Sequence, residues 1–491
     1  MKSARSAASE RARGRLYLGL SIVILIFFNS GSDWMRAEKG HIRSGGDLVT
    51  RGFVWPPWRA LQLYVSHDSD EHLFFEYTKL ILGEPADLHY IAAANLGDTA
   101  AIEAQLRQKF AARPGSRSPY RYIAVGYPPV GLLVLLLPRL VTSTLHGYRL
   151  VFGALMSAFF LGTMALGWRM ARRGGCGLTS AQWQKRTALL LFCVGPTLVM
   201  RYDIVPALLT AAVVAALSER RALLATAGLL LGVAAKLYPA LLVPTWLALL
   251  LGFAGPARRT AWRMVAALGG AGAVIALALL VRGGAIPLWA ERITFSVRPF
   301  QVESVPGALL ALPGWPESLA PSFGSFNAQS TLASRLLPHW DLVITATALT
   351  VAALAYVWAS RRRAASPEEQ SRALGVWTLV ALLLNLCVTK VLSAQYFIWC
   401  LPFAALVPGR RGRSILYGLA GLLFLTQLIY PALYGALIGG SGPVFALVLG
   451  RNLMLCALGA LGLAWLWRGE LTGVPDRRPP LPAAPPIEEV P

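Results

Sequence analysis

The chain has 491 residues, of which 55% are hydrophobic and only 14% are charged. Soluble domains usually carry about 25% charged residues, so this composition excludes an ordinary cytosolic enzyme and a disordered chain. The 46 lysines and arginines exceed the 24 acidic residues, which leaves a formal net charge of +22. Because the basic residues separate apolar runs instead of gathering in one segment, we predict an all-α polytopic integral membrane protein and no nucleic-acid partner.

Residues 1–15 are rich in basic side chains and precede an apolar run from Leu16 to Phe28. No small-residue cleavage site follows that run, so we predict a retained first transmembrane helix over 16–32 and not a removed signal peptide. Residues 1–15 are then a cytoplasmic N-terminus.

A long polar segment, 33–148, follows this helix and is predicted to be an outer loop that contains juxtamembrane helices. Its densest polar cluster runs from His67 to His72, and the apolar residues behind it have helical spacing, which indicates a helix that begins near Asp70. Three interpretations of the cluster are open. Asp70 caps that helix, Asp68 and Asp70 bind a divalent cation, or Asp70 is a general base at the membrane surface.

Apolar runs later in the chain predict the other crossings, because about 20 apolar residues span a bilayer. The stretch from Val130 to Leu145 is instead expected to lie along the outer face. If it crossed, the basic residues of 169–186 would fall outside, against the positive-inside rule. The expected crossings, about twelve in all, are 16–32, 149–168, 187–200, 204–218, 222–235, 239–253, 264–281, 341–360, 373–389, 394–408, 414–430 and 446–467.

These crossings divide the rest of the chain into four parts. Transmembrane helices 2–7 lie within 149–281, a second outer loop spans 282–340, and helices 8–12 lie within 341–467. Residues 468–491 are proline-rich and are predicted to be a disordered cytoplasmic tail. Short basic loops are then cytoplasmic, and both long polar segments are outside.

Charged residues at the outer ends of apolar runs are candidates for a site, because ionisable groups at membrane depth are costly unless they are paired or functional. Arg201, Asp203 and Lys236 lie there. In one interpretation, Arg201 and Asp203 neutralise each other and Lys236 extends to the surface. In the other, the cations form a pocket for a lipid-linked phosphate, to which arginine gives bidentate contacts and lysine a point charge.

Further polar and aromatic candidates lie in the outer turns. Gln301 and Glu303 follow Arg298 closely in the second outer loop, and Tyr396 and Trp399 belong to the segment LSAQYFIW. These two aromatic residues form either an interfacial belt or a wall that stacks on a sugar.

Seven segments, in one order over most of residues 65–405, resemble the polyprenyl-phosphate-sugar-dependent membrane glycosyltransferases, specifically glycosyltransferase family 87 of the GT-C fold. They are SDEHLFFEYTKLILGE, PYRYIAVGYPPVGLLVLLLP, YRLVFGALM, RYDIVPALLTAAVVAAL, AGLLLGVAAKLYPALLVP, RPFQVES and KVLSAQYFIWCLPFA. The resemblance implies a GT-C-like fold, a catalytic acidic residue in the first outer loop at Asp70, and a juxtamembrane helix at Tyr127-Pro128-Pro129.

The chain also departs from that family. Residues 86–118 are an insertion where the family runs almost directly from one motif to the next, and Tyr122 and Gly126 replace positions that are commonly acidic. A second carboxylate then has to come from elsewhere, and the candidates are Asp68, Asp203 and Glu303.

The resemblance implies an inverting glycosyltransferase at the extracytoplasmic face of a bacterial inner or plasma membrane. It would move a hexose, with mannose the first candidate, from a polyprenyl-phosphate donor to a hydroxyl of a glycolipid, glycan or protein acceptor. Asp70 would deprotonate the acceptor, with Asp68 and Asp33 as rivals, and no metal or other cofactor is expected to be obligatory. The donor phosphate would bind Arg201, Lys236 and Arg298, and the substrates would contact Tyr127, Asp203, Tyr238, Gln301, Glu303, Gln395 and Tyr396.

Two other functions fit the same features. A transporter or flippase of lipid-linked sugars also needs many helices and buried cations, although such proteins tend to have inverted repeats, which we do not find in this sequence. A ligase or polymerase that uses pyrophosphate-linked glycans shares the site and differs in its donor.

Overall fold

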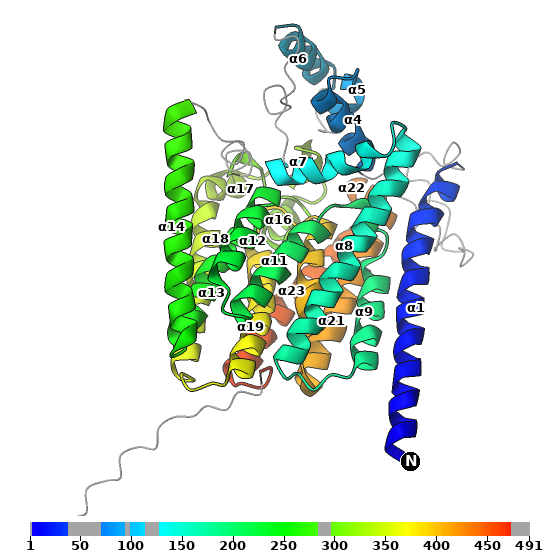
Figure 1. Cartoon of the computed structure of the whole chain (residues 1–491). Coiled ribbons are helices and arrows are strands. Elements are labelled where there is room, and N and C mark those ends of the chain that lie inside the picture. Colours follow the sequence, from blue (N-terminus) through cyan, green and yellow to red (C-terminus); the bar gives the residue numbers. More distant parts are fainter. Residues whose placement is uncertain (1, 38–69, 94–98, 113–126, 283–295, 473–491) are drawn as a thin grey trace, which may run out of the picture.

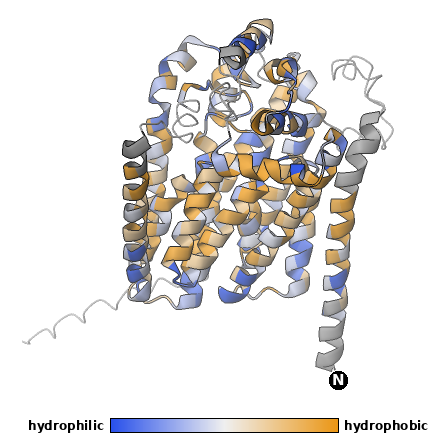
Figure 2. Cartoon of the chain, turned by 45° about the horizontal axis from the view of Figure 1, so that its top comes forward, coloured by the Kyte–Doolittle hydropathy of each residue, from blue (hydrophilic) through white to orange (hydrophobic). Residues whose placement is uncertain are grey.

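The computed structural model describes residues 2–37, 70–93, 99–112, 127–282 and 296–472. Within these residues the chain forms a bundle of helices that run along one common direction (Figure 1). Apolar residues follow the shafts of the helices and hydrophilic residues concentrate toward their ends (Figure 2). Five helices of the described part are long and apolar enough to cross a membrane: Leu145–Arg173, Thr331–Ser360, Pro367–Val388, Gly409–Ala432 and Gly442–Trp467. The chain is therefore an α-helical membrane protein.

These five stretches correspond to named elements. The first is α8 (Leu145–Arg173), and the second joins α17 (Thr331–Leu336), η5 (Leu337–His339) and α18 (Trp340–Ser360). The third is α19 (Pro367–Val388), and the fourth joins α21 (Gly409–Gln427) to η7 (Leu428–Ala432). The last is α23 (Gly442–Trp467), which follows the short helix α22 (Tyr434–Ile438).

The other predicted crossings also coincide with helical segments. α11 (Ile204–Ser218) and α12 (Ala222–Ala235) have the predicted bounds, and α13 (Pro239–Gly252) ends one residue early. At 1.5 Å per residue these three helices are roughly 21–23 Å long, shorter than the roughly 30 Å hydrocarbon core of a bilayer. A total of twelve crossings therefore stays a prediction. The remaining segments are α1 (Lys2–Ala37), α9 (Ser180–Val194), α10 (Thr197–Met200), α14 (Pro256–Arg282), η6 (Ala394–Cys400) and α20 (Leu401–Ala404).

α7 (Pro129–Leu136) and its extension η3 (Leu137–Leu140) lie across one end of the bundle and not along it (Figure 1). Proline is well tolerated at the first position of a helix, and α7 begins in this way at Pro129. The Tyr148 hydroxyl of α8 donates to the Leu135 carbonyl at 2.9 Å and ties α7 to the bundle. This placement agrees with the prediction that 130–145 does not cross. We call this end of the bundle the outer end, and the opposite end the inner end.

Three further helices stand at the outer end: α4 (Glu71–Leu82), α5 (Leu88–Ala93) and α6 (Thr99–Ala112). α4 packs on α7 and α8, whereas α5 and α6 pack on each other and project away from the bundle (Figure 1). The insertion predicted at 86–118 is thus helical in its described part. It is attached to α4, because the Asp87 amide donates to Glu76 Oε2 at 2.6 Å and the rings of His72 and Tyr90 lie 3.8 Å apart.

Within the described residues, the second outer loop contains a β-hairpin, which an all-α prediction omits. After α16 (Val305–Ala311) and η4 (Leu312–Gly314), strands β1 (Leu319–Ser322) and β2 (Ser325–Ala328) form an antiparallel hairpin in which Ser322 pairs with Ser325. Its two-residue turn has positive φ angles at Phe323 (52°) and Gly324 (68°), as tight hairpin turns require. Strands of four residues are too short to produce a clear alternating pattern in a sequence.

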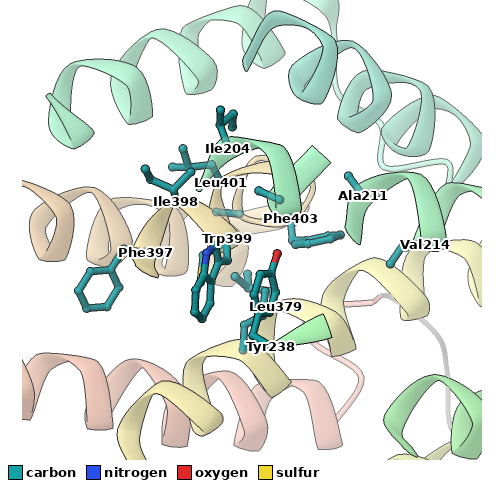
Figure 3. Packing of buried hydrophobic residues seen from close by; sticks show 14 of the residues in the cluster. Ile204, Ala211, Val214, Tyr238, Leu379, Phe397, Ile398, Trp399, Leu401 and Phe403 are labelled. Atoms are coloured by element: carbon teal, nitrogen blue, oxygen red, sulfur yellow. The ribbon is translucent and has the colours of Figure 1, made fainter. Parts of the chain in front are cut away.

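The core beneath the outer end is built by α11, α19 and the segment from η6 to α20. Figure 3 shows part of it, with Ile204, Ala211, Val214, Tyr238, Leu379, Phe397, Ile398, Trp399, Leu401 and Phe403. Trp399 is 5% exposed and lies inside this cluster. The interpretation of Trp399 as part of an interfacial aromatic belt is therefore wrong, because belt residues face the lipid headgroups.

Some arginines at the inner end form hydrogen bonds that connect parts of the structure. Arg186 NH1 donates to the carbonyls of Ala405 and Val407 at 2.9 and 2.7 Å. Arg372 donates to the carbonyls of Gly174 and Thr472 at 2.7 and 2.6 Å. These carbonyls lie near helix ends, where backbone groups lack partners within the helix, so these arginines join separate segments of the inner end.

Candidate functional site

Asp70 is the residue directly before α4, but its carboxylate does not cap that helix. The structure has no side-chain cap hydrogen bond at this position. The Asp70 carboxylate instead forms an ion pair with Arg201 NH1, and its side chain is 31% exposed. Among the three interpretations of Asp70, side-chain capping is thus wrong, and the carboxylate lies partly exposed at the outer end of the bundle.

Arg201 lies between α10 and α11, where the helical run breaks before Ile204. Its side chain is 8% exposed, and NH2 donates to the Tyr430 hydroxyl at 2.9 Å. Within the described residues, its Nε has no hydrogen-bond partner. Arg201 therefore pairs with Asp70 and not with Asp203, in contrast to the interpretation in which Arg201 and Asp203 neutralise each other.

Asp203 is paired with Lys236, which follows the last residue of α12. Lys236 Nζ donates to Asp203 Oδ1 at 2.6 Å, and Trp399 Nε1 donates to the same oxygen at 2.9 Å. Asp203 is 1% exposed, and its Oδ2 has no hydrogen-bond partner in the described part of the chain. Two donors from distant segments thus converge on one buried carboxylate.

The Lys236 ammonium group also lies among aromatic rings. It is 5.2 Å from the ring centroid of Tyr202, 4.8 Å from that of Tyr396 and 5.4 Å from that of Trp399. Such cation–π contacts stabilise a cation, most of all where it is shielded from water. Lys236 is therefore held inside the site, and it does not simply extend to the surface.

The rings of Tyr238, Trp399 and Tyr396 form a stack. Tyr238 lies 3.8 Å from Trp399 at an interplanar angle of 7°, and Tyr396 lies 4.4 Å from Trp399 at 21°. Two rings this close to one indole must lie on its opposite faces, and Figure 3 shows Tyr238 against Trp399. The Tyr238 hydroxyl also pairs with Thr210 Oγ1 at 2.8 Å. Of the three rings, only half-buried Tyr396 retains exposed surface for a substrate.

Tyr127 connects α4 to the start of α11. Its ring contacts Phe74 and Tyr202 edge-on, each at 5.3 Å between centroids. Burial raises the pKa of Tyr127 well above its ordinary value, and the nearby phenol of Tyr202 acts in the same direction. The Tyr127 hydroxyl is therefore neutral at physiological pH.

Residues 300–304 enter the bundle as irregular backbone. The backbone N–H of Gln301 donates to the Lys390 carbonyl at 2.9 Å. Two side chains of α23 also bind this segment: Arg451 NH2 donates to the Glu303 carbonyl, and Asn452 Nδ2 donates to the Ser304 carbonyl at 3.2 Å. Arg451 lies roughly 14 Å along α23 from its first residue, at 1.5 Å per residue. Buried backbone groups outside regular structure need hydrogen-bond partners, and these bonds supply them.

The side chains of Gln301 and Glu303 are buried with this segment. Gln301 Nε2 donates to Glu303 Oε2 at 2.5 Å, and Gln301 Oε1 accepts from the Leu392 amide at 3.0 Å. Burial raises the pKa of the Glu303 carboxyl from 4.5 to about 7. The charges of Arg451 and Arg201 act in the opposite direction, so Glu303 lies within electrostatic reach of Arg201.

The raised pKa of Glu303 predicts a pH-dependent stability. Between pH 4.5 and about 7 the folded chain keeps a proton that the unfolded chain releases, so stability falls as the pH rises through this window. The full change is about 3 kcal/mol. We expect the melting temperature in detergent to decrease from about pH 5 to about pH 8 more steeply in the native protein than in Glu303→Gln. Glu317→Gln, which removes an exposed carboxylate of the same loop, should keep the native slope; equal slopes in all three would contradict the prediction.

The other predicted site residues lie elsewhere or outside the described residues. Arg298 NH2 donates to the Phe323 carbonyl at 2.8 Å in the turn of the hairpin, and half-buried Gln395 lies in η6. Asp33 belongs to α1, and Asp68 falls outside the described residues. Within the described ranges, no group of three or more histidine, cysteine, aspartate and glutamate side chains could hold a metal ion.

Two residues of the site were not predicted from the sequence. Tyr430 binds Arg201 through its hydroxyl, and its ring centroid lies 5.8 Å from the Arg201 guanidinium carbon. Arg451 is fully buried and holds the backbone of residues 300–304. A signal for Arg451 was present, because it is a charge inside an apolar run.

The geometry brings Asp70, Arg201, Asp203, Lys236 and Tyr396 together at the outer end of the bundle. No family model, no curated protein and no solved structure matches the chain. Chemically, the described site offers a carboxylate beside a buried guanidinium, a second carboxylate paired with an ammonium group, and a half-buried aromatic ring.

Proposed function

We propose that the chain is an inverting glycosyltransferase that uses a polyprenyl-phosphate sugar, with mannose as the first candidate hexose. The observation that carries the proposal is the direct ion pair between Asp70 and Arg201 beside the buried pair of Asp203 and Lys236. Transfer from a phosphate ester needs a base for the acceptor and positive charge for the departing phosphate. Both kinds of group lie at one end of the bundle.

The proposed step is a single displacement. Asp70 takes the proton of the acceptor hydroxyl, and the acceptor oxygen bonds to the anomeric carbon of the sugar as the bond from that carbon to the phosphate oxygen breaks. The electron pair of the broken bond stays on the polyprenyl phosphate. Arg201 offsets the charge that develops there, and Lys236 adds to the positive potential of the site from within its aromatic surroundings.

The substrates would meet the site at the side chains that remain accessible. Tyr396 and Gln395 are half-buried in η6, and Arg298 lies at the hairpin of the second outer loop. Asp203, Tyr238, Gln301 and Glu303 are each less than 9% exposed, so we assign them to the support of the site. Half-buried Tyr127 packs edge-on against the Tyr202 ring next to Lys236.

The proposal includes a GT-C-like fold in a bacterial inner or plasma membrane, with about twelve crossings. Short basic loops at the inner end favour a cytoplasmic inner end and cytoplasmic termini. The site then opens to the extracytoplasmic face, where a glycolipid, glycan or protein supplies the acceptor hydroxyl. No cofactor is part of the proposed step, and a divalent cation at Asp68 and Asp70 remains the alternative that chelation would test.

A donor comparison in proteoliposomes tests this function. We expect incorporation of radiolabelled hexose from polyprenyl-phosphate mannose, or a similar monophosphate sugar, into a membrane extract that contains acceptors. Incorporation only from pyrophosphate-linked glycans would favour the ligase or polymerase function. Movement of labelled lipid-linked sugar between leaflets without any transfer would favour the transporter, and either result would overturn the proposal.

A further inference from the structure

We infer that Arg201 is a shared partner, which pairs with Asp70 before the donor binds and with the donor phosphate afterwards, so that donor binding releases the Asp70 carboxylate. The inference rests on the proposed function and adds an order to it. The donor phosphate binds first, and the base becomes available second.

The contacts of Arg201 favour replacement of the Asp70 carboxylate by the donor phosphate at NH1. NH2 donates to the Tyr430 hydroxyl at 2.9 Å, and the Arg201 side chain is only 8% exposed, so the guanidinium is fixed from the protein side. The Asp70 side chain is 31% exposed. Asp70 is thus the partner on the accessible side of the guanidinium, and it is the one that an arriving anion can replace.

Arg201 also has unused capacity. Its Nε is buried and has no hydrogen-bond partner within the described part of the chain. A guanidinium binds carboxylates and phosphates through the same fork of N–H donors. NH1 and NH2 form such a fork, and NH2 has a second N–H besides the one that Tyr430 accepts. A phosphate that binds this fork would therefore take over the NH1 donor that Asp70 now accepts from.

The second cation of the site does not offer the phosphate an easier partner. Lys236 is paired with Asp203 at 2.6 Å, and Asp203 is 1% exposed. Removal of Lys236 from that pair would leave a buried carboxylate without its counter-charge, which is strongly unfavourable. An arriving phosphate is therefore expected to compete with Asp70 for Arg201 before it competes with Asp203 for Lys236.

This exchange links binding to chemistry. A carboxylate that is held by an arginine is a weaker base than the same carboxylate without that pair. When the phosphate takes Arg201, Asp70 gains basicity at the moment when an activated donor is present. After transfer the polyprenyl phosphate leaves with its electron pair, and Arg201 returns to Asp70.

The test is the affinity for farnesyl phosphate, a short polyprenyl phosphate, measured by calorimetry in detergent at one salt concentration. If Asp70 and phosphate compete for Arg201, Asp70→Asn should bind farnesyl phosphate more tightly than the native protein, by roughly tenfold, while it loses transfer. Arg201→Gln should weaken binding, and in the double variant the Asp70→Asn change should bring no gain. Glu84→Gln removes another outer carboxylate–arginine pair, that of Glu84 with Arg139 at 2.6 Å, and should leave the affinity unchanged.

The outcomes separate this inference from the proposed function. Native binding with an unchanged or weaker affinity in Asp70→Asn would overturn the shared partner and leave the glycosyltransferase proposal intact. An Asp70→Asn gain that persists in the Arg201→Gln background would also overturn it, since the competition would not involve Arg201. No binding of farnesyl phosphate by the native protein, together with no hexose transfer from a polyprenyl-phosphate sugar, would overturn both.

Discussion

Replacement of Asp70 by asparagine is expected to lower the rate of hexose transfer by about 10²–10⁴-fold, the usual contribution of a general base. Asparagine has nearly the same shape but does not take up the acceptor proton. Because Asp70 is partly exposed and its carboxylate does not cap α4, the variant should fold normally. Initial rates with radiolabelled donor, together with the melting temperature in detergent, measure the two effects separately.

Two variants make this result interpretable. Asp70→Glu keeps a carboxylate and should recover part of the rate, which a role limited to helix stability would not predict. Glu84→Gln serves as the matched control, since Glu84 lies in the same outer segment, just beyond α4, and pairs with Arg139. Near-normal transfer in folded Asp70→Asn would remove Asp70 from the catalytic role.

Loss of Lys236 is expected to affect stability and donor use together. Lys236→Ala leaves the buried Asp203 carboxylate without its ion pair, and breaking one partner of a buried pair costs about 3–5 kcal/mol. We expect a lower melting temperature and, in the fraction that folds, weaker use of the donor than of the acceptor.

A paired substitution separates these two effects. Asp203→Asn with Lys236→Met removes both charges, so no unpaired buried carboxylate remains and much of the lost stability should return. Donor use should stay impaired, because the positive charge next to Tyr396 is still missing. A stable double variant with a native KM for the donor would show that the pair serves the fold alone.

The positions of helices and of charged site residues could be predicted because each depends on local sequence. α11 and α12 have their predicted ends since an apolar run stops at a charged residue or a turn, and Arg201 and Lys236 stand at those stops. The partners of these charges could not be predicted. Arg201 reaches Asp70 only because α4 packs over α7 and α8, which is a tertiary arrangement without a local signal.

The same reason explains the residues that were missed. Tyr430 is separated from Arg201 by 229 positions in the chain, and nothing near Tyr430 in the sequence indicates that contact. Residues 300–304 look like an ordinary polar loop, and only their bonds to Lys390, Arg451 and Asn452 reveal that they enter the bundle. The β1–β2 hairpin could not be predicted, because strands of four residues are too short to show a clear alternation of apolar and polar residues.

The arginines of the inner end have a consequence for how the protein is made. Arg372 bonds the carbonyls of Gly174 and Thr472, and Arg186 bonds those of Ala405 and Val407. In each case an acceptor lies far downstream in the chain, and domains generally form as the N-terminal part emerges first. Arg186 is therefore synthesised long before its acceptors, and Arg372 can bond both of its acceptors only after α23 has been synthesised. Complete packing of the inner end therefore depends on synthesis of the C-terminal part of the chain. In contrast, α4, α7 and α8 can pack at the outer end long before translation is complete.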